Sequence, residues 1–376
     1  MADFPNISIN WIKNFWERLL IMIKIGIVTI QSINYGNRLQ NYALSKVLSN
    51  FGECETFYSD EEDTKFSRRV KKRLLILRNR TKFDSFMSFN NLIPYSNILY
   101  CKKNYQNLNK KYDFFIAGSD QIWNPNFNFI SEREFLQFSE KKKNIAYAAS
   151  LGVDKLNEEK AKQYRYYLEN FNSISLREEK GAEVIGNLMN KKYPVVLDPT
   201  MLLSKKEWEN VISNTLYMPK KKYIFMYILG QLPSNMYDAI KKYASDNSLE
   251  IFILKDIEDG DNRPIGPSEF IGLIKNSAIV CTDSFHASVF SILFHKPFGY
   301  FSRIVEKGLG DMSSRLVTLL EMFELQNHIV SDPNEISVIG EEYDYERVDQ
   351  VLEYRKNKSI DFLKQAIIND AEQEGK

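Results

Sequence analysis

Short stretches rich in β-branched and aromatic residues alternate with helical stretches along this chain, and that alternation constrains the fold more than any other feature. Residues 24–30 form a largely apolar run that predicts a strand buried on both faces, and residues 38–51 follow it with apolar side chains at helical spacing. Such alternation is typical of parallel sheets built from βαβ units. Further strands are predicted at residues 53–58, 113–117, 144–148, 172–175, 193–197, 223–227, 250–254, 278–281 and 298–301, and a further helix at 158–167.

The strands fall into two series, and 376 residues exceed the roughly 100–200 that one core normally fills. We therefore expect an α/β protein with one domain at residues 24–185 and a second at residues 190–343. Residues 1–23 are expected to form an amphipathic extension, and residues 344–376 a long polar helix that straps one domain to the other. Because two open parallel sheets bind ligands at the carboxyl ends of their strands, functional residues are sought in the loops after strands.

The charges balance almost completely, with 50 Lys and Arg against 49 Asp and Glu and a formal net charge of +1. This balance excludes bulk attraction to nucleic acid, and no nucleic-acid partner is expected. The cysteines Cys54, Cys101 and Cys281 contain no C-x-x-C pair, which argues against a zinc site and for a reducing compartment. Neither a signal peptide nor a membrane-spanning stretch is recognisable, so the expected location is the cytoplasm.

Two segments have a composition that suits a membrane surface. Residues 8–22 place aromatic and aliphatic side chains at helical spacing opposite polar ones, and residues 65–82 contain nine basic residues and no acidic one. We expect these segments to make peripheral contact with anionic lipid at the inner face of the membrane. The alternatives are a helix packed on the protein body for the first segment and a solvated face for the second.

The loop after the first predicted strand is the first loop whose side chains indicate a ligand site. It carries Asn34, Tyr35 and Asn37 around Gly36, which permits close approach of the backbone, and it leads into a helix whose free N–H groups can receive an anion. The loop lacks the G-x-G-x-x-G pattern, so a dinucleotide is not indicated.

The second loop, residues 118–125, places polar side chains around one tryptophan. Ser119, Asp120 and Gln121 offer hydrogen bonds and Trp123 an aromatic face, a mixture that is typical of sugar sites. The alternative is a capped turn in which Trp123 simply packs.

Two further loops carry side chains suited to anions. Arg177 comes directly after a strand, where its guanidinium is expected to bind a carboxylate or phosphate in the cleft, unless Glu178 or Glu179 pairs with it. Ser284 can cap a helix that follows another strand, and His286 then lies in the first turn of that helix, beside N–H groups that attract an anion. His286 is a candidate general acid, the alternative being a packing histidine.

Together and in this order, these loops resemble the polysaccharide pyruvyl transferase family. The similarity runs from about Lys24 to Leu325, and Ala287-Ser288 departs from the Gly-Thr often found after the histidine. It is carried by Asn34-Tyr-Gly-Asn-Arg-Leu-Gln-Asn-Tyr-Ala-Leu44, Gly118-Ser-Asp-Gln-Ile-Trp-Asn124, Ser175-Leu-Arg-Glu-Glu179, Leu197-Asp-Pro-Thr200, Thr282-Asp-Ser-Phe-His286 and Ser313-Ser-Arg315.

The resemblance implies two Rossmann-like domains that face each other across a cleft, in the glycosyltransferase-B arrangement. It also implies transfer of the enolpyruvyl unit of phosphoenolpyruvate onto two hydroxyls of a sugar, commonly the 4,6-diol of galactose or another hexose. The acceptor is expected to be part of a lipid-linked precursor of a capsular, extracellular or cell-wall polysaccharide, and the products are a pyruvate ketal and phosphate.

In this scheme the first domain holds the acceptor and the second holds the donor. His286 protonates the methylene carbon, Arg177 assists, and Asp120 is a base or a hydroxyl ligand. The expected donor ligands are Arg177, Ser284, Phe285, His286 and Arg315, and the expected acceptor ligands are Asn34, Tyr35, Asn37, Ser119, Asp120, Gln121 and Trp123. No cofactor and no metal are expected, and the D-x-D pattern at residues 259–261 is interpreted as a turn.

Two other functions remain open at this stage. A glycosyltransferase that uses a nucleotide-sugar has the same two-domain architecture, because fold does not determine function. A carbohydrate-binding protein without catalytic activity would also fit the sugar-like loop.

Overall fold

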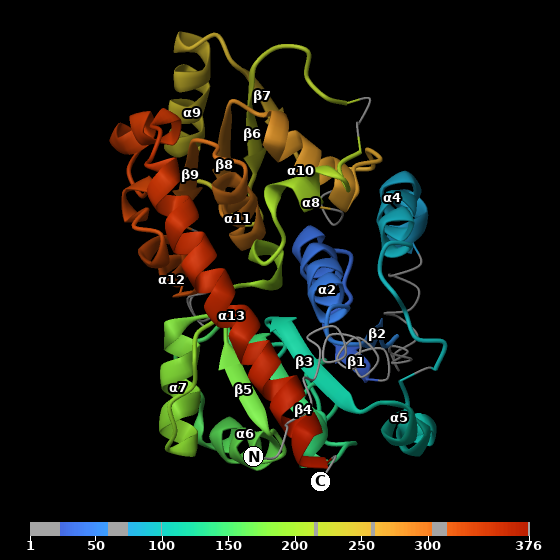
Figure 1. Ribbon diagram of the computed structural model, residues 1–376. Coiled ribbons are helices and arrows are strands. Elements are labelled where there is room, and N and C mark those ends of the chain that lie inside the picture. Colours follow the sequence, from blue (N-terminus) through green and yellow to red (C-terminus); the bar gives the residue numbers. More distant parts are fainter. Residues whose placement is uncertain are drawn as a thin grey trace, which may run out of the picture.

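Two five-stranded parallel sheets form the framework of the chain in the computed structural model, which describes residues 23–58, 74–98, 100–213, 217–256, 260–302 and 314–374 (Figure 1). The predicted extension at residues 8–22 and the basic residues 65–73 therefore lie outside the described residues. Each sheet belongs to one Rossmann-like domain, and the two domains face each other in the glycosyltransferase-B arrangement that was expected.

The first sheet has the strand order β2-β1-β3-β4-β5, so the chain crosses over where β1 lies between β2 and β3. In the register of the sheet, Ala117 of β3 lies opposite Val28 of β1 and Ala146 of β4. The strands are β1 (Lys24–Val28), β2 (Glu53–Thr56), β3 (Phe114–Asp120), β4 (Asn144–Ala149) and β5 (Ser173–Leu176). The helices of this domain are α2 (Tyr35–Leu48), α4 (Arg80–Asn90), α5 (Tyr105–Lys111), α6 (Glu158–Leu168) and α7 (Glu179–Met189).

The second sheet has the order β10-β9-β8-β6-β7 and is also parallel throughout. Its strands are β6 (Tyr223–Tyr227), β7 (Glu250–Ile253), β8 (Ile279–Thr282), β9 (Phe298–Phe301) and β10 (Ile329–Val330). The helices that follow in the chain are α8 (Lys205–Glu209), α9 (Ser234–Asp246), α10 (Pro267–Asn276), α11 (Phe285–Leu293), α12 (Ser314–Met322) and α13 (Tyr345–Glu374).

One predicted strand, at residues 193–197, is wrong. Val195 forms only an isolated bridge to Leu176, at the end of β5 and therefore beside the first sheet. Pairing stops there because the chain turns at Asp198 into a short 3₁₀ helix, η3 (Pro199–Met201). The fifth strand of the second sheet is instead β10, which is too short to produce a pattern in the sequence.

Helix α2 joins the two domains into one interior. Every residue of α2 except Lys46 is buried, because the helix lies between the first sheet and α10 and α11 of the second domain (Figure 1). A single cluster of buried apolar residues accordingly contains Ile25 and Ile116 from the first sheet together with Phe225 and Val280 from the second. The domains therefore share part of their core.

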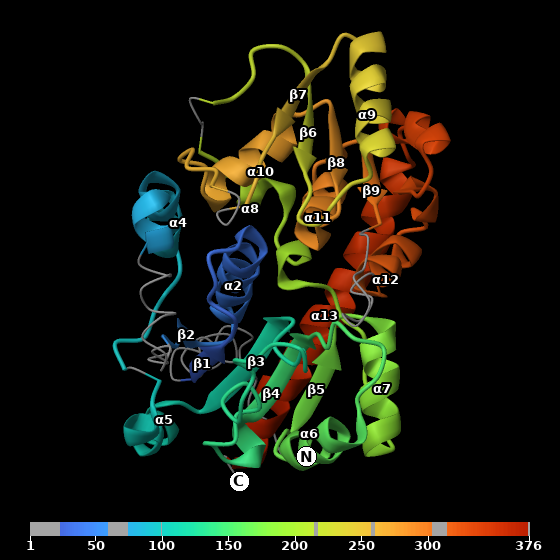
Figure 2. The ribbon, with the colours of Figure 1, turned by 180° about the vertical axis from the view of Figure 1, so that it is seen from behind.

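Helix α13 straps the domains together, as the sequence predicted, and runs across both in Figures 1 and 2. Near its start, Tyr345 stacks on His295 of the second domain with 4.8 Å between ring centroids. Further along, the Ser359 hydroxyl accepts a hydrogen bond of 3.0 Å from the Leu197 amide, and Phe362 packs on Tyr147 of β4.

Part of the predicted basic helix joins the domains instead of facing a membrane. Residues 74–78 form a helical turn and α4 begins at Arg80. Lys82 is buried, and its ammonium donates a hydrogen bond of 2.6 Å to the Lys255 carbonyl of the second domain. The expectation of a lipid-facing role is therefore wrong for Lys82.

Candidate active site

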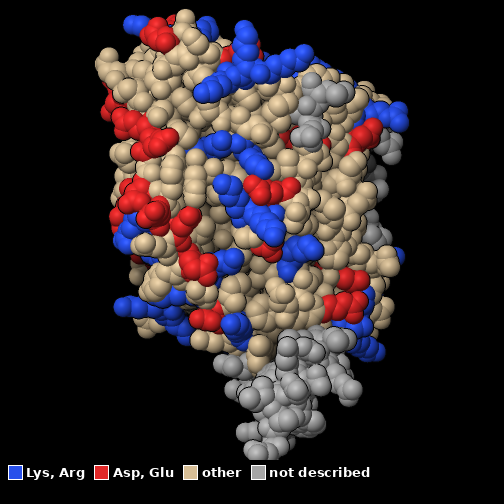
Figure 3. All heavy atoms as spheres, turned by 45° about the horizontal axis from the view of Figure 1, so that its top comes forward, with Lys and Arg blue, Asp and Glu red and all other residues tan. Residues whose placement is uncertain are grey.

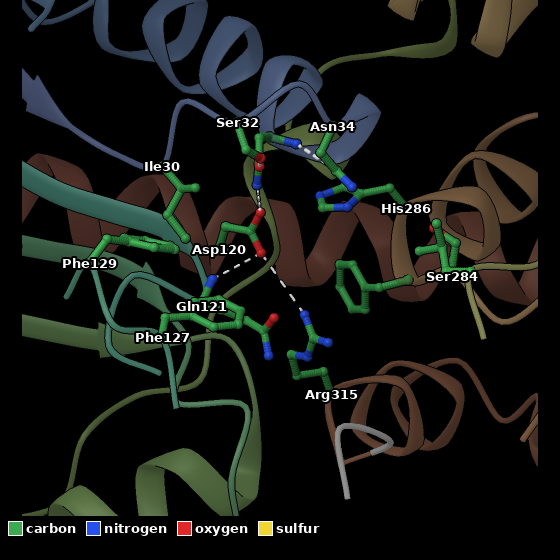
Figure 4. Close-up of a pocket in the computed structure, with 13 residues that line it drawn as sticks. Ile30, Ser32, Asn34, Asp120, Gln121, Phe127, Phe129, Ser284, His286 and Arg315 are labelled. Atoms are coloured by element: carbon green, nitrogen blue, oxygen red, sulfur yellow. Dashed lines mark hydrogen bonds and ion pairs between the residues drawn. The ribbon is translucent and has the colours of Figure 1, made fainter. Parts of the chain in front are cut away.

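A pocket of about 320 Å³ lies between the domains, where loops after strands of both sheets meet (Figure 4). Strand β3 ends in it at Asp120, and α11 enters it with His286. The pocket is lined by Ile30, Ser32, Asn34, Asn37, Asp120, Gln121, Phe127, Phe129, Leu229, Ser284, Phe285, His286 and Arg315. The strand ends thus meet where parallel-sheet topology predicts a ligand.

Asp120 is fixed in the pocket by contacts on both carboxylate oxygens. Its Oδ1 accepts hydrogen bonds from Arg177 Nη2 at 3.0 Å and from the Gln121 amide at 2.9 Å, and its Oδ2 accepts one from the Asn37 amide group. The backbone of Asp120 has φ of 69°, in the left-handed region that only a few non-glycine residues adopt. Such a conformation persists where surrounding contacts enforce it, and it occurs most often at functional sites.

Arg177 bridges two buried carboxylates. Its Nη1 donates to Asp198 Oδ2 at 2.7 Å, and its guanidinium lies over the Phe285 ring at 4.5 Å from the centroid. The side chain is only 1% exposed. Arg177 does not line the pocket, but its bonds to Asp120 and Asp198 use only part of its N–H donors, so its expected role as a donor ligand stays a prediction.

Asp198 is the second anion of this cluster. Its Oδ1 accepts hydrogen bonds from the amide and the hydroxyl of Thr200, at 3.0 Å and 2.6 Å. Its Oδ2 faces Arg177 and lies 3.6 Å from Nε2 of His286. Asp198 therefore connects the first domain to the histidine of the second.

The charges of this cluster keep both carboxyl groups ionised. Burial alone would raise the pKa of Asp120, but Arg177, His286 and Arg315 together hold it below the usual value. Burial likewise opposes ionisation of Asp198, and His286 and Arg177 overcome it so that the pKa of Asp198 is strongly lowered. Burial would lower the pKa of Arg177, whereas the two aspartates raise it.

His286 lies in the first turn of α11, whose N-cap Ser284 accepts a hydrogen bond from the Ala287 amide. Its Nδ1 side rests against Gly36 of α2, where any side chain would overlap the imidazole. Among the residues that the structure describes, none is hydrogen-bonded to Nε2, although that atom is buried. Nε2 faces Asp198 Oδ2, which lies 3.6 Å away and therefore beyond hydrogen-bond distance.

Arg315 completes the charged end of the pocket from α12. Its Nη1 lies 3.9 Å from Asp120 Oδ1, and its side chain is 12% exposed, in contrast to the almost fully buried Arg177. Arg315 is thus the guanidinium that faces the pocket, as expected for a donor ligand.

Comparison with known proteins identifies the family. A model of the family described as polysaccharide pyruvyl transferase matches residues 34–303, which is more than half of the chain. The chain belongs to the polysaccharide pyruvyl transferase family. It is therefore a transferase of polysaccharide biosynthesis, and the match includes the loops that carry Asp120, Arg177 and His286. A search of curated proteins gave no match.

Solved structures resemble this chain only remotely. UDP-GlcNAc 2-epimerase from Neisseria meningitidis has 12% identity and a TM-score of 0.46, over 93% of this chain and 100% of that one. MurG from Acinetobacter baumannii has 7% identity and a TM-score of 0.41, over 92% and 99% of the respective chains. These likenesses are too distant to bear on substrate or reaction.

Of the acceptor ligands expected in this pyruvyl transferase, Asn34, Asn37, Asp120 and Gln121 line the pocket. Of the expected donor ligands, Ser284, Phe285, His286 and Arg315 do so.

Tyr35, Ser119 and Trp123 do not line the pocket, and their expected role as acceptor ligands is wrong. Tyr35 points into the second domain, where it stacks on Phe270 and donates a hydrogen bond to the Ile265 carbonyl at 2.9 Å. Ser119 is fully buried and donates to the Ala148 carbonyl at 2.9 Å. The Trp123 indole is also fully buried, and its N–H donates to the Glu134 carbonyl at 3.1 Å. The alternative, a packing tryptophan, is therefore correct.

Sequence reasoning did not assign Asp198 to the site, nor the pocket-lining residues Ile30, Ser32, Phe127, Phe129 and Leu229. Asp198 directly follows the segment predicted as a strand at 193–197. A search for polar residues in the loops after strands would therefore have identified it. Phe127 and Phe129 lie in an irregular loop that gives no periodic signal, and only the structure places them at the pocket.

Within the described residues, no three His, Cys, Asp or Glu side chains gather closely enough to hold a metal ion. Asp261 of the D-x-D pattern instead pairs with Arg263 at 2.6 Å and accepts the Lys255 amide at 3.1 Å, in a turn as predicted, whereas Asp259 lies outside the described residues.

Proposed function

We propose that this pocket transfers the enolpyruvyl unit of phosphoenolpyruvate onto two hydroxyls of a hexose, most simply the 4,6-diol, to form a pyruvate ketal. In the balanced reaction, two C–O bonds form between the sugar oxygens and the central carbon, and the C–O bond to phosphate breaks. One hydroxyl proton ends on the methyl carbon, and the other leaves with inorganic phosphate. No further cofactor enters this scheme.

The observation that carries the proposal is the charge at the His286 end of the pocket. Two guanidiniums, Arg177 and Arg315, lie together with His286 beside two carboxylates, Asp120 and Asp198. The N-terminus of α11 also lies at this end, where its first amide groups attract anions. A protonated His286 beside this helix end suits a donor that carries both a phosphate and a carboxylate.

Each residue of the cluster then has a chemical task. Protonation of the methylene carbon by His286 makes the central carbon cationic, and the first sugar hydroxyl attacks it and returns its proton to His286. The second hydroxyl replaces the phosphate, which takes that hydroxyl's proton. An ionised Asp120 stabilises that positive charge and accepts a hydrogen bond from the attacking hydroxyl. Because its lowered pKa makes Asp120 a weak base, we assign it this electrostatic role in preference to proton abstraction.

Two measurements test the donor. Phosphoenolpyruvate should raise the melting temperature of the protein, because a ligand that binds only the folded state stabilises it. Incubation with phosphoenolpyruvate and a panel of hexosides should release phosphate and add the mass of a pyruvate ketal to one of them. Stabilisation by a nucleoside diphosphate but not by phosphoenolpyruvate would favour a nucleotide-sugar glycosyltransferase and contradict the proposal.

We further propose that the acceptor is lipid-linked and that the protein meets it in the cytoplasm, at the inner face of the membrane. The described helices include none long and apolar enough to cross a bilayer. The helical turn before α4, however, exposes Leu74 and Leu77 by 59% and 68%, next to the exposed Arg78 and Arg80. Exposed leucines beside basic side chains favour contact with anionic lipid. On the face shown in Figure 3, by contrast, acidic and basic side chains are interspersed.

Vesicle binding tests this contact. The double variant Leu74→Asp/Leu77→Asp, and a chain without residues 1–22, should each sediment less with phosphatidylglycerol vesicles than the full chain does. Turnover on a soluble acceptor should be retained, and Tyr354→Asp, a change at another exposed side chain, should leave sedimentation unchanged. Equal sedimentation of all variants would contradict the proposed contact.

A further inference from the structure

Two phenylalanines form an aromatic wall on the side of the pocket away from His286. Phe127 and Phe129 both line the pocket, and their rings stack with 5.2 Å between centroids and 25° between planes. Phe129 is 42% exposed, so its ring is accessible to a ligand in the pocket. In Figure 4 the two rings lie with Ile30 on one side of Asp120, and His286 and Arg315 lie on the other side.

The loop that carries these rings is held by its ends. Trp123 anchors one end through its hydrogen bond to Glu134 and its stacking on Phe135, at 5.3 Å between centroids. Within the loop, the Phe127 amide donates to the Asn124 carbonyl, and the Ile130 amide to the Phe127 carbonyl, each at 3.1 Å. The backbone that presents the rings is therefore fixed by contacts that do not involve the rings.

A polar group of the pocket lies beside the aromatic wall. Asp120 lines the same pocket, and Figure 4 shows its carboxylate between the two rings and Arg315. An apolar face next to the Asp120 carboxylate matches the two surfaces of a pyranose, one of C–H bonds and one of hydroxyls.

We infer that Phe127 and Phe129 are the platform for the acceptor sugar, and that they select a pyranose of galacto configuration. This inference rests on the proposed function, because it takes the acceptor to be a hexose. In the galacto configuration the axial 4-hydroxyl leaves the C3–H, C4–H and C5–H bonds together on one face, and that face packs on the rings. The 4- and 6-hydroxyls then point away from the platform, toward Asp120 and the donor end.

Binding of simple glycosides without any donor tests the platform. Saturation-transfer NMR with methyl β-galactoside should show the strongest transfer at H3, H4 and H5 of the sugar. Removing one ring, in Phe127→Ala or Phe129→Ala, should weaken galactoside binding about threefold to tenfold, the usual worth of one aromatic contact. The double variant should lose more than either single one, and Phe129→Trp should bind like the wild type.

The controls separate this inference from the proposed function. Tyr166→Ala removes an aromatic ring that is 69% exposed away from the pocket, and it should leave galactoside binding unchanged. Wild-type affinity in the double alanine variant, or no galactoside binding by the wild type, would overturn the platform, and equal affinity for methyl β-glucoside would overturn the configuration. Because no donor is present, ring-dependent galactoside binding supports the platform even if phosphoenolpyruvate is never consumed. Phosphate release by an enzyme whose double variant binds galactoside normally overturns the platform alone.

Discussion

Replacing His286 with glutamine should lower kcat for phosphate release by about 10²- to 10⁴-fold, the usual contribution of a general acid. Glutamine keeps a polar group near the position of Nε2 but supplies no transferable proton, so the KM for phosphoenolpyruvate should change much less than kcat. Steady-state phosphate release at saturating acceptor measures both constants.

The matched control for this change is a histidine outside the pocket. His295 pairs with Asp349 at 2.9 Å and stacks on Tyr345, remote from the pocket lining. His295→Gln should retain wild-type kcat. Near-normal turnover of His286→Gln would show that another group protonates the donor.

Replacing Arg177 with alanine should lower the free energy of unfolding and abolish phosphate release. The change leaves Asp120 and Asp198 buried without their shared guanidinium, and removing one member of a buried ion pair typically costs about 3–5 kcal/mol. Denaturant unfolding measures the free-energy loss. Arg347→Ala, which breaks an exposed pair with Glu324, should leave the unfolding midpoint unchanged.

The Arg177→Ala variant should also unfold at a higher pH on acidification than the wild type. A carboxyl group whose pKa is lowered by folding stabilises the folded protein. This contribution is fully present when the pH is above the pKa of the unfolded chain, about 3.9 for Asp, and it is lost as the pH falls through the folded pKa. Asp120 and Asp198 both have lowered pKa values, partly because of Arg177. Their pKa values rise in Arg177→Ala, so its acid-unfolding midpoint should move to higher pH. An unchanged midpoint would mean that Arg177 does not hold these carboxylates ionised.

Most of the strands could be predicted from the sequence because both faces of a parallel sheet are covered, which leaves runs such as 223–227 almost wholly apolar. The segment 193–197 has the same composition and misled the prediction, because composition reports burial and not the presence of a neighbouring strand to pair with. It is buried at Val196 and Leu197, but beside the end of β5.

The candidate site could be located from sequence, but not the direction of its side chains. Asp120, His286 and Arg315 line the pocket because the ends of strands and the starts of helices fix their positions. Whether Trp123 faces the pocket or the interior depends on Phe135 and Glu134, which are more than ten residues away along the chain. Likewise, Arg177 pairs with Asp120 and Asp198 and not with the adjacent Glu178 or Glu179, and no local pattern reveals such pairings.

The strap formed by α13 has a consequence for the order in which the chain folds during synthesis. Domains usually fold as the ribosome releases them, N-terminal domain first. Here the ring that packs on Tyr147 of the first sheet and the hydroxyl that binds the Leu197 amide both belong to α13, the last of the described helices to be translated. Similarly, Tyr35 of the first domain stacks on Phe270, which is translated later as part of the second domain. The first domain therefore completes its packing only after the second has emerged, so a nascent chain exposes part of its future core until α13 has left the ribosome.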